Sequence, residues 1–187
     1  MLLALTGCGL SPTRHPAVVP DTLQATAKAG DTKAQMQMAL QCDRNGDFEE
    51  AVYWYRLAAE QGVSEAQNNL GVMYKDGQGV SQDEKEAVRW FLLAARQGNP
   101  MAQSNLGWMY QAGKGVHQDY DSAHYWYREA ARQGHAAAQN NLAILFRDGL
   151  GIPCDTDSAR YWFQQAARQG LPQARHSLNR LDSTSTN

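Results

Sequence analysis

Residues 102–134 read AQSNLGWMYQAGKGVHQDYDSAHYWYREAARQG, and closely related stretches occupy residues 66–98 and 138–170. The earlier of these begins AQNNLGVMYKDGQGV and the later AQNNLAILFRDGLGI. A shorter relative, AQMQMALQCDRNGD, begins at Ala34. Every copy ends in Gln-Gly, and the glutamines recur every 36 residues, at Gln61, Gln97, Gln133 and Gln169. A period of this length indicates a stack of repeats in which each unit contacts only its neighbours.

Each copy is predicted to form two helices joined by a loop. The second half places apolar residues at positions i, i+3, i+4, i+7 and i+8, which share one helical face. In the stretch quoted first, these residues are Ala123, Trp126, Tyr127, Ala130 and Ala131. The first half of the preceding copy carries Ala66, Leu70, Gly71 and Tyr74 at helical spacing. Gly71 and Gly107 are costly within a helix, so we expect another helix backbone to come close there.

The loop between the two helices has its own signature, Gly77-Gln78-Gly79-Val80 and two counterparts. We expect the glycines to end the first helix in left-handed conformations, and Val80 to pack between the loop and the core. Asp83, Asp119 and Asp155 follow and are interpreted as acceptors at helix N-termini. The shortest copy lacks four residues here, so Asn45-Gly46 is predicted to make a tight turn.

The composition is that of a globular protein, with 43% apolar residues and a formal net charge of −2. Its 17 Lys and Arg are spread among 19 Asp and Glu, so no clustered basic face for nucleic acid is expected. No apolar run approaches the roughly 18 residues that span a bilayer. The five histidines have no spacing that gathers metal ligands, and no nucleophile or metalloprotease motif is present. The sequence therefore indicates no catalytic residue, cofactor or metal site.

Two of the cysteines fall within the repeats. Cys42 is in register with Tyr74 and is predicted to be a buried thiol. Cys154 lies in the last loop, three repeats away, which corresponds to about 30 Å at roughly 10 Å per repeat. A disulfide needs Cα atoms within about 7 Å, so both thiols are expected to be free.

These residues resemble the Sel-one-like repeat (SLR) family, a relative of the tetratricopeptide repeats. The pattern that carries the resemblance is Ala66, Leu70, Gly71, Tyr74, Gly77, Gly79, Val80, Ala87, Trp90, Ala94, Ala95 and Gly98. The resemblance implies an all-α fold, a right-handed α-α superhelical solenoid of about four helix pairs with partial capping helices at both ends. It also implies a concave inner face.

The expected boundaries follow from the period. The solenoid is predicted to cover residues 21–180, with repeats at about 31–62, 63–98, 99–134 and 135–170 and a cap at 171–180. A disordered tail is expected at residues 181–187.

The first residues carry a second resemblance. Leu5-Thr6-Gly7-Cys8 resembles the lipobox of bacterial lipoproteins, in which the cysteine, here Cys8, receives a diacylglyceryl thioether. We expect residues 1–8 to be a signal segment truncated at its N-terminus, because no Lys or Arg precedes Cys8. Residues 9–20, with three prolines, are predicted to form an extended tether. Gly9 resembles the residue that follows the cysteine in chains sorted to the outer membrane, so the expected location is periplasmic and lipid-anchored to the outer membrane.

In related folds the first helix of each repeat lines the concave face, and its outward positions become candidate partner-binding residues. These positions are Asn68, Asn69, Val72, Lys75, Ser104, Asn105, Trp108, Gln111, Asn140, Asn141, Ile144 and Arg147. Asn69, Asn105 and Asn141 form a ladder of amides. The ladder either holds an extended partner backbone or bonds to the adjacent helix and fastens the stack.

Trp108 departs from the repeat pattern, because its counterparts are Val72 and Ile144. A Trp that the scaffold does not require is either an anchor for a partner or a side chain that fills the core. The other four Trp residues are predicted to lie in the core.

The leading hypothesis is a non-catalytic periplasmic scaffold that binds another protein through the concave face. Small SLR lipoproteins occur as immunity proteins against phospholipase effectors of type VI secretion systems, so the resemblance implies a partner of this class. The alternative is a lipoprotein that assists envelope assembly or exopolysaccharide export. A remote alternative is a β-lactamase-like SLR enzyme, but such relatives carry a pair of cysteines in each repeat and this chain does not.

Overall fold

The computed structural model describes residues 21–184. Cys8, the segment around it and the tether at residues 9–20 lie outside the described residues. Within the described part the chain forms ten helices and no strand. The helices are α1 (Asp21–Lys28), α2 (Thr32–Asn45), α3 (Phe48–Glu60), α4 (Ser64–Asp76), α5 (Glu84–Arg96), α6 (Pro100–Ala112), α7 (Tyr120–Arg132), α8 (Ala136–Asp148), α9 (Thr156–Arg168) and α10 (Pro172–Thr184). The prediction of an all-α solenoid is confirmed.

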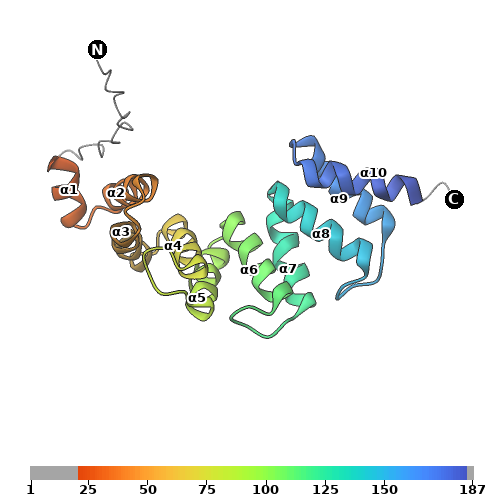
Figure 1. The fold of residues 1–187 in the computed structure, drawn as a ribbon, viewed down its shortest axis with the longest axis horizontal. Helices are drawn as coiled ribbons and strands as arrows, with labels where there is room; N and C mark the ends of the chain where they lie inside the picture. The colour runs from red at the N-terminus through yellow and green to blue at the C-terminus, as the bar shows by residue number, and fades with distance from the viewer. Residues whose placement is uncertain (1–20, 185–187) are drawn as a thin grey trace, which may run out of the picture.

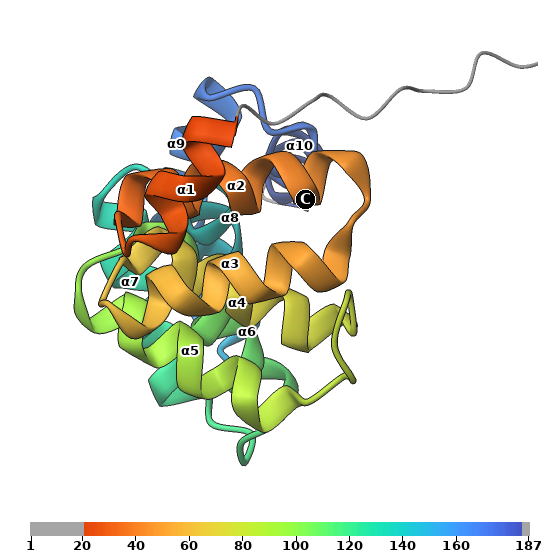
Figure 2. The same ribbon diagram turned by 90° about the vertical axis from the view of Figure 1, so that its left-hand side faces the viewer.

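The helices form an arch in which each packs mainly against the next one in the chain. Figure 1 shows α2, α4 and α6 along the inner side of the arch, with α3 and α5 on its outer side. Figure 2, turned by 90°, shows the successive helix pairs rotating around the stack. None of the helices between Asp21 and Thr184 is long and apolar enough to cross a membrane.

The first helix of a repeat ends at a glycine, and the second begins at an aspartate, as predicted. Gly77 has a φ of 68°, and its N–H donates to the carbonyl oxygen of Met73. Asp83 precedes α5 and accepts from the N–H groups of Lys85 and Glu86. The same pair of caps recurs at Gly113 and Asp119, and at Gly149 and Asp155. These side-chain and backbone acceptors satisfy groups that the helix itself leaves unpaired.

The mid-helix glycines make room for aromatic rings. A Cβ atom at Gly71 would lie 2.7 Å from Cδ1 of Phe91, and one at Gly107 would lie 2.7 Å from Cδ1 of Tyr127. The prediction that a helix backbone comes close at these glycines is therefore wrong, since a ring from the second helix occupies the space. Each ring fills the core between the two helices of its repeat.

The second glycine of each loop contacts the repeat before it. A Cβ atom at Gly79 would overlap the carbonyl group of Phe48 at the start of α3. Gly115 has the same relation to Glu84 in α5. Val80 and Val116 pack against the core clusters beneath these loops, as predicted. The loop thus fastens two successive repeats through backbone contact.

Buried glutamines link the repeats in a recurring relay. The amide of Gln67 donates to the carbonyl oxygen of Ala59 at 3.0 Å, and its own oxygen accepts from Gln97 at 2.7 Å. The same two bonds are made around Gln35, Gln103 and Gln139. The glutamine of the Ala-Gln that begins each copy is therefore hydrogen-bonded to the glutamine that ends the same copy and to the second helix of the unit before it.

The two ends of the solenoid differ from its interior. Helix α1 corresponds to the C-terminal half of the second helix of a repeat. Its Ala27 carbonyl oxygen accepts a hydrogen bond from the side chain of Gln35, as the Ala59 carbonyl oxygen accepts one from Gln67. Helix α10 occupies the position of a first helix and is the last helix of the described residues. It carries exposed Arg175 and Asn179 where complete repeats have the buried glutamine and the small residue that faces a ring.

Helix α10 also corrects the expected C-terminal boundary. It runs to Thr184, and Leu181 is buried against the last core cluster. The prediction of a disordered tail from residue 181 is wrong for residues 181–184, because the buried leucine extends the helix. Residues 185–187 lie outside the described part.

Candidate protein-binding surface

The first helices present equivalent positions at each repeat. One row consists of Leu40, Val72, Trp108 and Ile144, and a second row consists of Gln37, Asn69, Asn105 and Asn141. The second row lies three residues, or nearly one helical turn, before the first. All eight side chains are at least partly exposed. We call them the apolar row and the amide row.

Three of the predicted outward residues are buried instead. Asn68 is 4% exposed, Ser104 7% and Asn140 9%. The prediction that they point outward is wrong, because the surrounding protein covers more than nine-tenths of each residue's surface. Asn68 shows this directly, since its side-chain oxygen accepts from Nδ2 of Asn105 at 3.0 Å.

The amide row is largely engaged within the protein. Nδ2 of Asn68 donates to the side-chain oxygen of Asn69, and Asn140 donates in the same way to Asn141 at 3.4 Å. Asn69 and Asn141 also hydrogen-bond the hydroxyls of Tyr55 and Tyr127. The structure thus supports the interpretation that these amides fasten the stack.

Tyr127 connects the amide row to the end of α6. Its hydroxyl donates to Oε1 of Gln111 at 2.8 Å. Burial raises the pKa of Tyr127, while its hydrogen bond with Asn141 lowers it. Gln111 therefore has its side chain committed to an internal bond, which reduces its value as a partner contact.

The apolar row is centred on Trp108. This side chain is 40% exposed, so the alternative that it fills the core is excluded. Met101 lies two turns earlier on α6 and is 44% exposed. Nζ of Lys75 lies 5.9 Å from the centroid of the Trp108 ring, and Nζ of Lys114 lies 5.8 Å from it. We call Trp108, Met101, Lys75 and Lys114 the Trp108 patch.

The remaining predicted residues flank this patch. Val72 and Ile144 are half-buried, and they pack against the core clusters of their own regions. Arg147 pairs with Asp148 at 2.6 Å, and this contact raises the pKa of Arg147 and lowers that of Asp148. Apart from the buried Asn68, Ser104 and Asn140, the predicted residues are at least partly exposed on the first helices, and Trp108 is the most exposed of the apolar ones.

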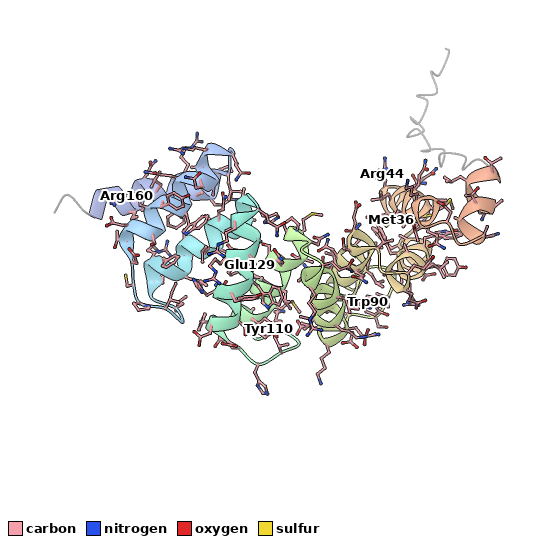
Figure 3. The ribbon with its side chains drawn as sticks, turned by 180° about the vertical axis from the view of Figure 1, so that it is seen from behind. Met36, Arg44, Trp90, Tyr110, Glu129 and Arg160 are labelled. Carbon is pink, nitrogen blue, oxygen red and sulfur yellow. The ribbon has the colours of Figure 1, made fainter. Side chains whose placement is uncertain are left out.

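The sequence analysis missed the part of this surface that belongs to α2. A groove of about 370 Å³ lies between α2 and the start of α4. Its lining includes Met36, Leu40, Lys33, Arg44 and Glu65. Figure 3 marks Met36 and Arg44 on α2, at one end of the arch. The signal was available, because Leu40 stands at the position of Val72 in the shortest copy.

The outer helices carry a second set of exposed aromatic residues. Tyr53, Tyr125 and Tyr161 are about half exposed, and each packs edge-on against the tryptophan that follows it. The prediction of a core position is confirmed for Trp54 and Trp90, which are buried. Trp126 and Trp162 are half-buried instead, because the outer side of the stack leaves part of each ring uncovered.

A metal site or a reactive thiol would have to come from the protein's titratable side chains. Among residues 21–184, no three His, Cys, Asp or Glu side chains lie close enough to hold a metal ion. Cys42 is buried, and burial raises its pKa to about 11. Cys154 is exposed, and both thiols are free. Burial lowers the pKa of His124 and of His135, and the imidazole of His135 accepts from the N–H of Ala138 as a helix cap.

Comparison with known proteins agrees with this architecture. A model of the Sel1 repeat matches residues 32–63, 64–99, 100–135 and 136–171, and no catalytic family is indicated. These limits lie within one residue of the repeat boundaries expected from the sequence. None of the curated proteins compared matches the chain.

Solved structures with the same fold include two relatives of moderate identity. The protein c5321, described as a protective antigen present in uropathogenic Escherichia coli strains, is 37% identical with a TM-score of 0.80. The match covers 84% of this chain and 35% of c5321. A Sel1 repeat protein from Oxalobacter formigenes is 34% identical with a TM-score of 0.78, over 83% of this chain and 64% of that protein. This chain thus spans less than two thirds of either relative.

A more distant likeness shows the fold alone. Cysteine rich protein B of Helicobacter pylori is 22% identical with a TM-score of 0.53, over 66% of this chain and 97% of that protein.

Proposed function

Because the chain belongs to the Sel1 repeat family, whose members bind other proteins, we propose that it is a non-catalytic scaffold that holds a protein partner against its first helices. The exposure of Trp108 is the observation that carries this proposal. Val72 and Ile144 stand at the same position in the neighbouring repeats, so the fold does not require an indole there. Large exposed aromatic side chains at the centre of a surface are frequent anchors of protein interfaces.

The scaffold is suited to tight binding because it is already ordered. Internal hydrogen bonds hold the amide row and the glutamine relay in place before any partner arrives. A partner then loses less conformational freedom of the surface on binding, which favours affinity. The inner surface of an arch also contacts more of a rounded partner than a flat surface does.

The specific partner that we propose is a secreted phospholipase toxin of a type VI secretion system. The support is the resemblance of this chain to small SLR lipoproteins that act as immunity proteins. Cys8 would carry a lipid that anchors the chain on the periplasmic side of the outer membrane. The solenoid would then cover the catalytic opening of the toxin and exclude the lipid substrate.

Titration of a type VI phospholipase effector with the purified protein tests the proposal. The purified protein is expected to inhibit hydrolysis of phospholipid vesicles at a stoichiometric ratio. Trp108→Ala is expected to weaken the inhibition at least tenfold, since anchor residues contribute about 2 kcal/mol or more. Tyr53→Ala, on the outer helix α3, is the matched control and should inhibit like the wild type.

Two results would count against the proposal. If the protein binds the toxin without inhibiting it, the scaffold role is kept and the immunity role is refuted. Equal inhibition by the wild type and Trp108→Ala would refute the assignment of the Trp108 patch as the binding surface. The anchor is tested separately with labelled fatty acid, which should be incorporated into the full-length protein and absent from Cys8→Ala.

A further inference from the structure

The Trp108 patch combines an apolar centre with cations from two different elements. Lys75 comes from the end of α4, and Lys114 comes from the loop between α6 and α7. Both ammonium groups lie within 6 Å of the same ring centroid, at 5.9 and 5.8 Å. An ammonium at this distance from an indole is attracted to its ring face. The two cations are therefore held beside an exposed apolar surface.

Each cation also has an acidic neighbour. Nζ of Lys75 lies 2.7 Å from Asp76, and Nζ of Lys114 lies 2.9 Å from Glu84. All four side chains are partly exposed. Exposed pairs of this kind contribute only about 0–1 kcal/mol, so an incoming carboxylate can replace or join the present partner at little cost. An ammonium group has three donors, which allows it to bond two acceptors together.

The patch itself contains no carboxylate. Helix α6, which supplies Trp108 and Met101, has no acidic residue at all. On the neighbouring first helices the charged groups are Glu65, Lys75 and Asp76 in α4, and Arg147 and Asp148 in α8. Arg147 and Asp148 pair with each other. A partner group placed on the Trp108 ring therefore lies near Lys75 and Lys114, whose present partners are the partly exposed carboxylates of Asp76 and Glu84.

We propose that the partner docks here through a short acidic segment in which an apolar side chain is flanked by carboxylates. The apolar side chain packs on the Trp108 ring and Met101. The flanking carboxylates accept from Lys75 and Lys114. This inference rests on the proposed function, because it names the chemistry of the partner segment at the same surface. A basic segment is disfavoured, since its charges would approach two ammonium groups.

Three labelled peptides of nine residues test the charge preference. Each has a central leucine, which is flanked by two aspartates, two serines or two lysines. Binding is measured by fluorescence anisotropy on the full chain. The aspartate peptide is expected to bind about tenfold more tightly than the serine peptide, from two exposed ion pairs, and the lysine peptide most weakly. The preference should decrease as salt is added, because exposed charges are screened.

Variants that remove either the positive or the negative charges around Trp108 sharpen the test. Lys75→Gln with Lys114→Gln should abolish the preference for the aspartate peptide, whereas Asp76→Asn with Glu84→Gln should increase it. Trp108→Ala should weaken the binding of all three peptides by a similar factor. Lys85→Gln removes an exposed lysine outside the patch and serves as the matched control, with unchanged affinities expected. Thermal unfolding of each variant shows that it is folded.

The outcomes separate the two proposals. The acidic-segment proposal is overturned if the three peptide affinities keep the same order in the variant with Lys75→Gln and Lys114→Gln. It is also overturned if the aspartate peptide does not bind at millimolar concentration. In either case the toxin titration with Trp108→Ala still decides whether this surface docks a protein. Toxin binding that is unaffected by Trp108→Ala overturns both.

Discussion

At the residue scale, a loop glycine can be required for two reasons, a positive φ and a lack of space for a side chain, and substitutions can measure the two separately. Gly62 and Gly79 both have a positive φ, of 87° and 66°. A Cβ atom at Gly62 would meet nothing within 4 Å, whereas one at Gly79 would overlap the Phe48 carbonyl. Gly62→Ala should lower the free energy of unfolding by about 1 kcal/mol from backbone strain. Gly79→Ala should lower the free energy of unfolding by roughly 3 kcal/mol, because the added methyl group would also push the loop away from the start of α3.

Urea denaturation followed by circular dichroism measures both variants. Since neither residue is in a helix, helix propensity does not contribute to the comparison. Equal costs at the two glycines would show that the contact between the loop and the preceding repeat adds nothing to stability.

The Cys42 thiol is expected to be inert while the protein is folded. Burial raises its pKa to about 11 from a usual value of 9.0, so about a hundredfold fewer thiolates are present at pH 8. The exposed thiol of Cys154 should react with iodoacetamide under the same conditions. Peptide mass spectrometry should find Cys42 modified only after urea is added. Labelling of native Cys42 at the rate seen in urea would contradict its place in the core.

Residue roles that depend on local geometry were predicted well, and roles that depend on neighbours were not. Asp83 and Gly77 were identified as caps because capping requires only nearby backbone groups. Asn68 was placed outside, yet it is buried against the next repeat. The helical period shows which residues share a face. It does not show whether that face meets solvent or an adjacent helix, since this depends on the rotation between repeats.

At the scale of elements, the glutamine relay is a connection between helices that can be dissected. Gln67→Ala removes the donor to the Ala59 carbonyl and the acceptor for Gln97. We expect a loss of about 1–3 kcal/mol, since buried polar groups are left unpaired. Gln97→Ala should cost less, because Gln97 is exposed. The double variant should cost less than the sum of the two, with a coupling of at least about 0.5 kcal/mol.

Gln37→Ala is the control for this cycle. Gln37 is exposed on α2 and stands outside the relay, so its substitution should change the free energy of unfolding by less than about 0.5 kcal/mol. Strict additivity of Gln67→Ala and Gln97→Ala would mean that the 2.7 Å bond between them contributes nothing.

The helices themselves were predictable from the sequence, whereas their connections were only partly so. Small and aromatic residues at helical spacing defined both helices of each repeat. The Gln-Gly and Ala-Gln pairs were visible as conspicuous repeated residues, but their bonds join residues 30 apart, such as Gln67 and Gln97. A pairing of that kind becomes evident only when the two helices of a repeat are placed against each other in space.

At the scale of the whole molecule, the main contacts among residues 21–184 are between consecutive helices, within a repeat or from one repeat to the next. The longer links, from Asn105 to Asn68 and from Gly115 to Glu84, each cross a single boundary. The period alone predicted this arrangement. The terminal helices were harder to delimit, because α10 departs from the repeat at Arg175 and Asn179 while still burying Leu181.

One internal repeat should therefore be removable. Deletion of residues 100–135 joins two equivalent positions. Asn141 can then donate to Asn68 as Asn105 does, and Gly151 can pack on Glu84 as Gly115 does. Because a solenoid is stabilised by its repeats and their nearest interfaces, we expect a folded, helical protein that unfolds cooperatively with a smaller m-value.

Deletion of residues 104–135 is the matched control, since it removes four residues fewer and breaks the register. It should lose helical structure and the cooperative transition in circular dichroism. The in-phase deletion should also lose binding of the aspartate peptide, although it is folded, because it removes Trp108 and Lys114 while Val72 and Ile144 remain. An unfolded in-phase variant would show that stability depends on more than neighbouring repeats. Retained peptide binding would show that the apolar row, and not the Trp108 patch, forms the docking surface.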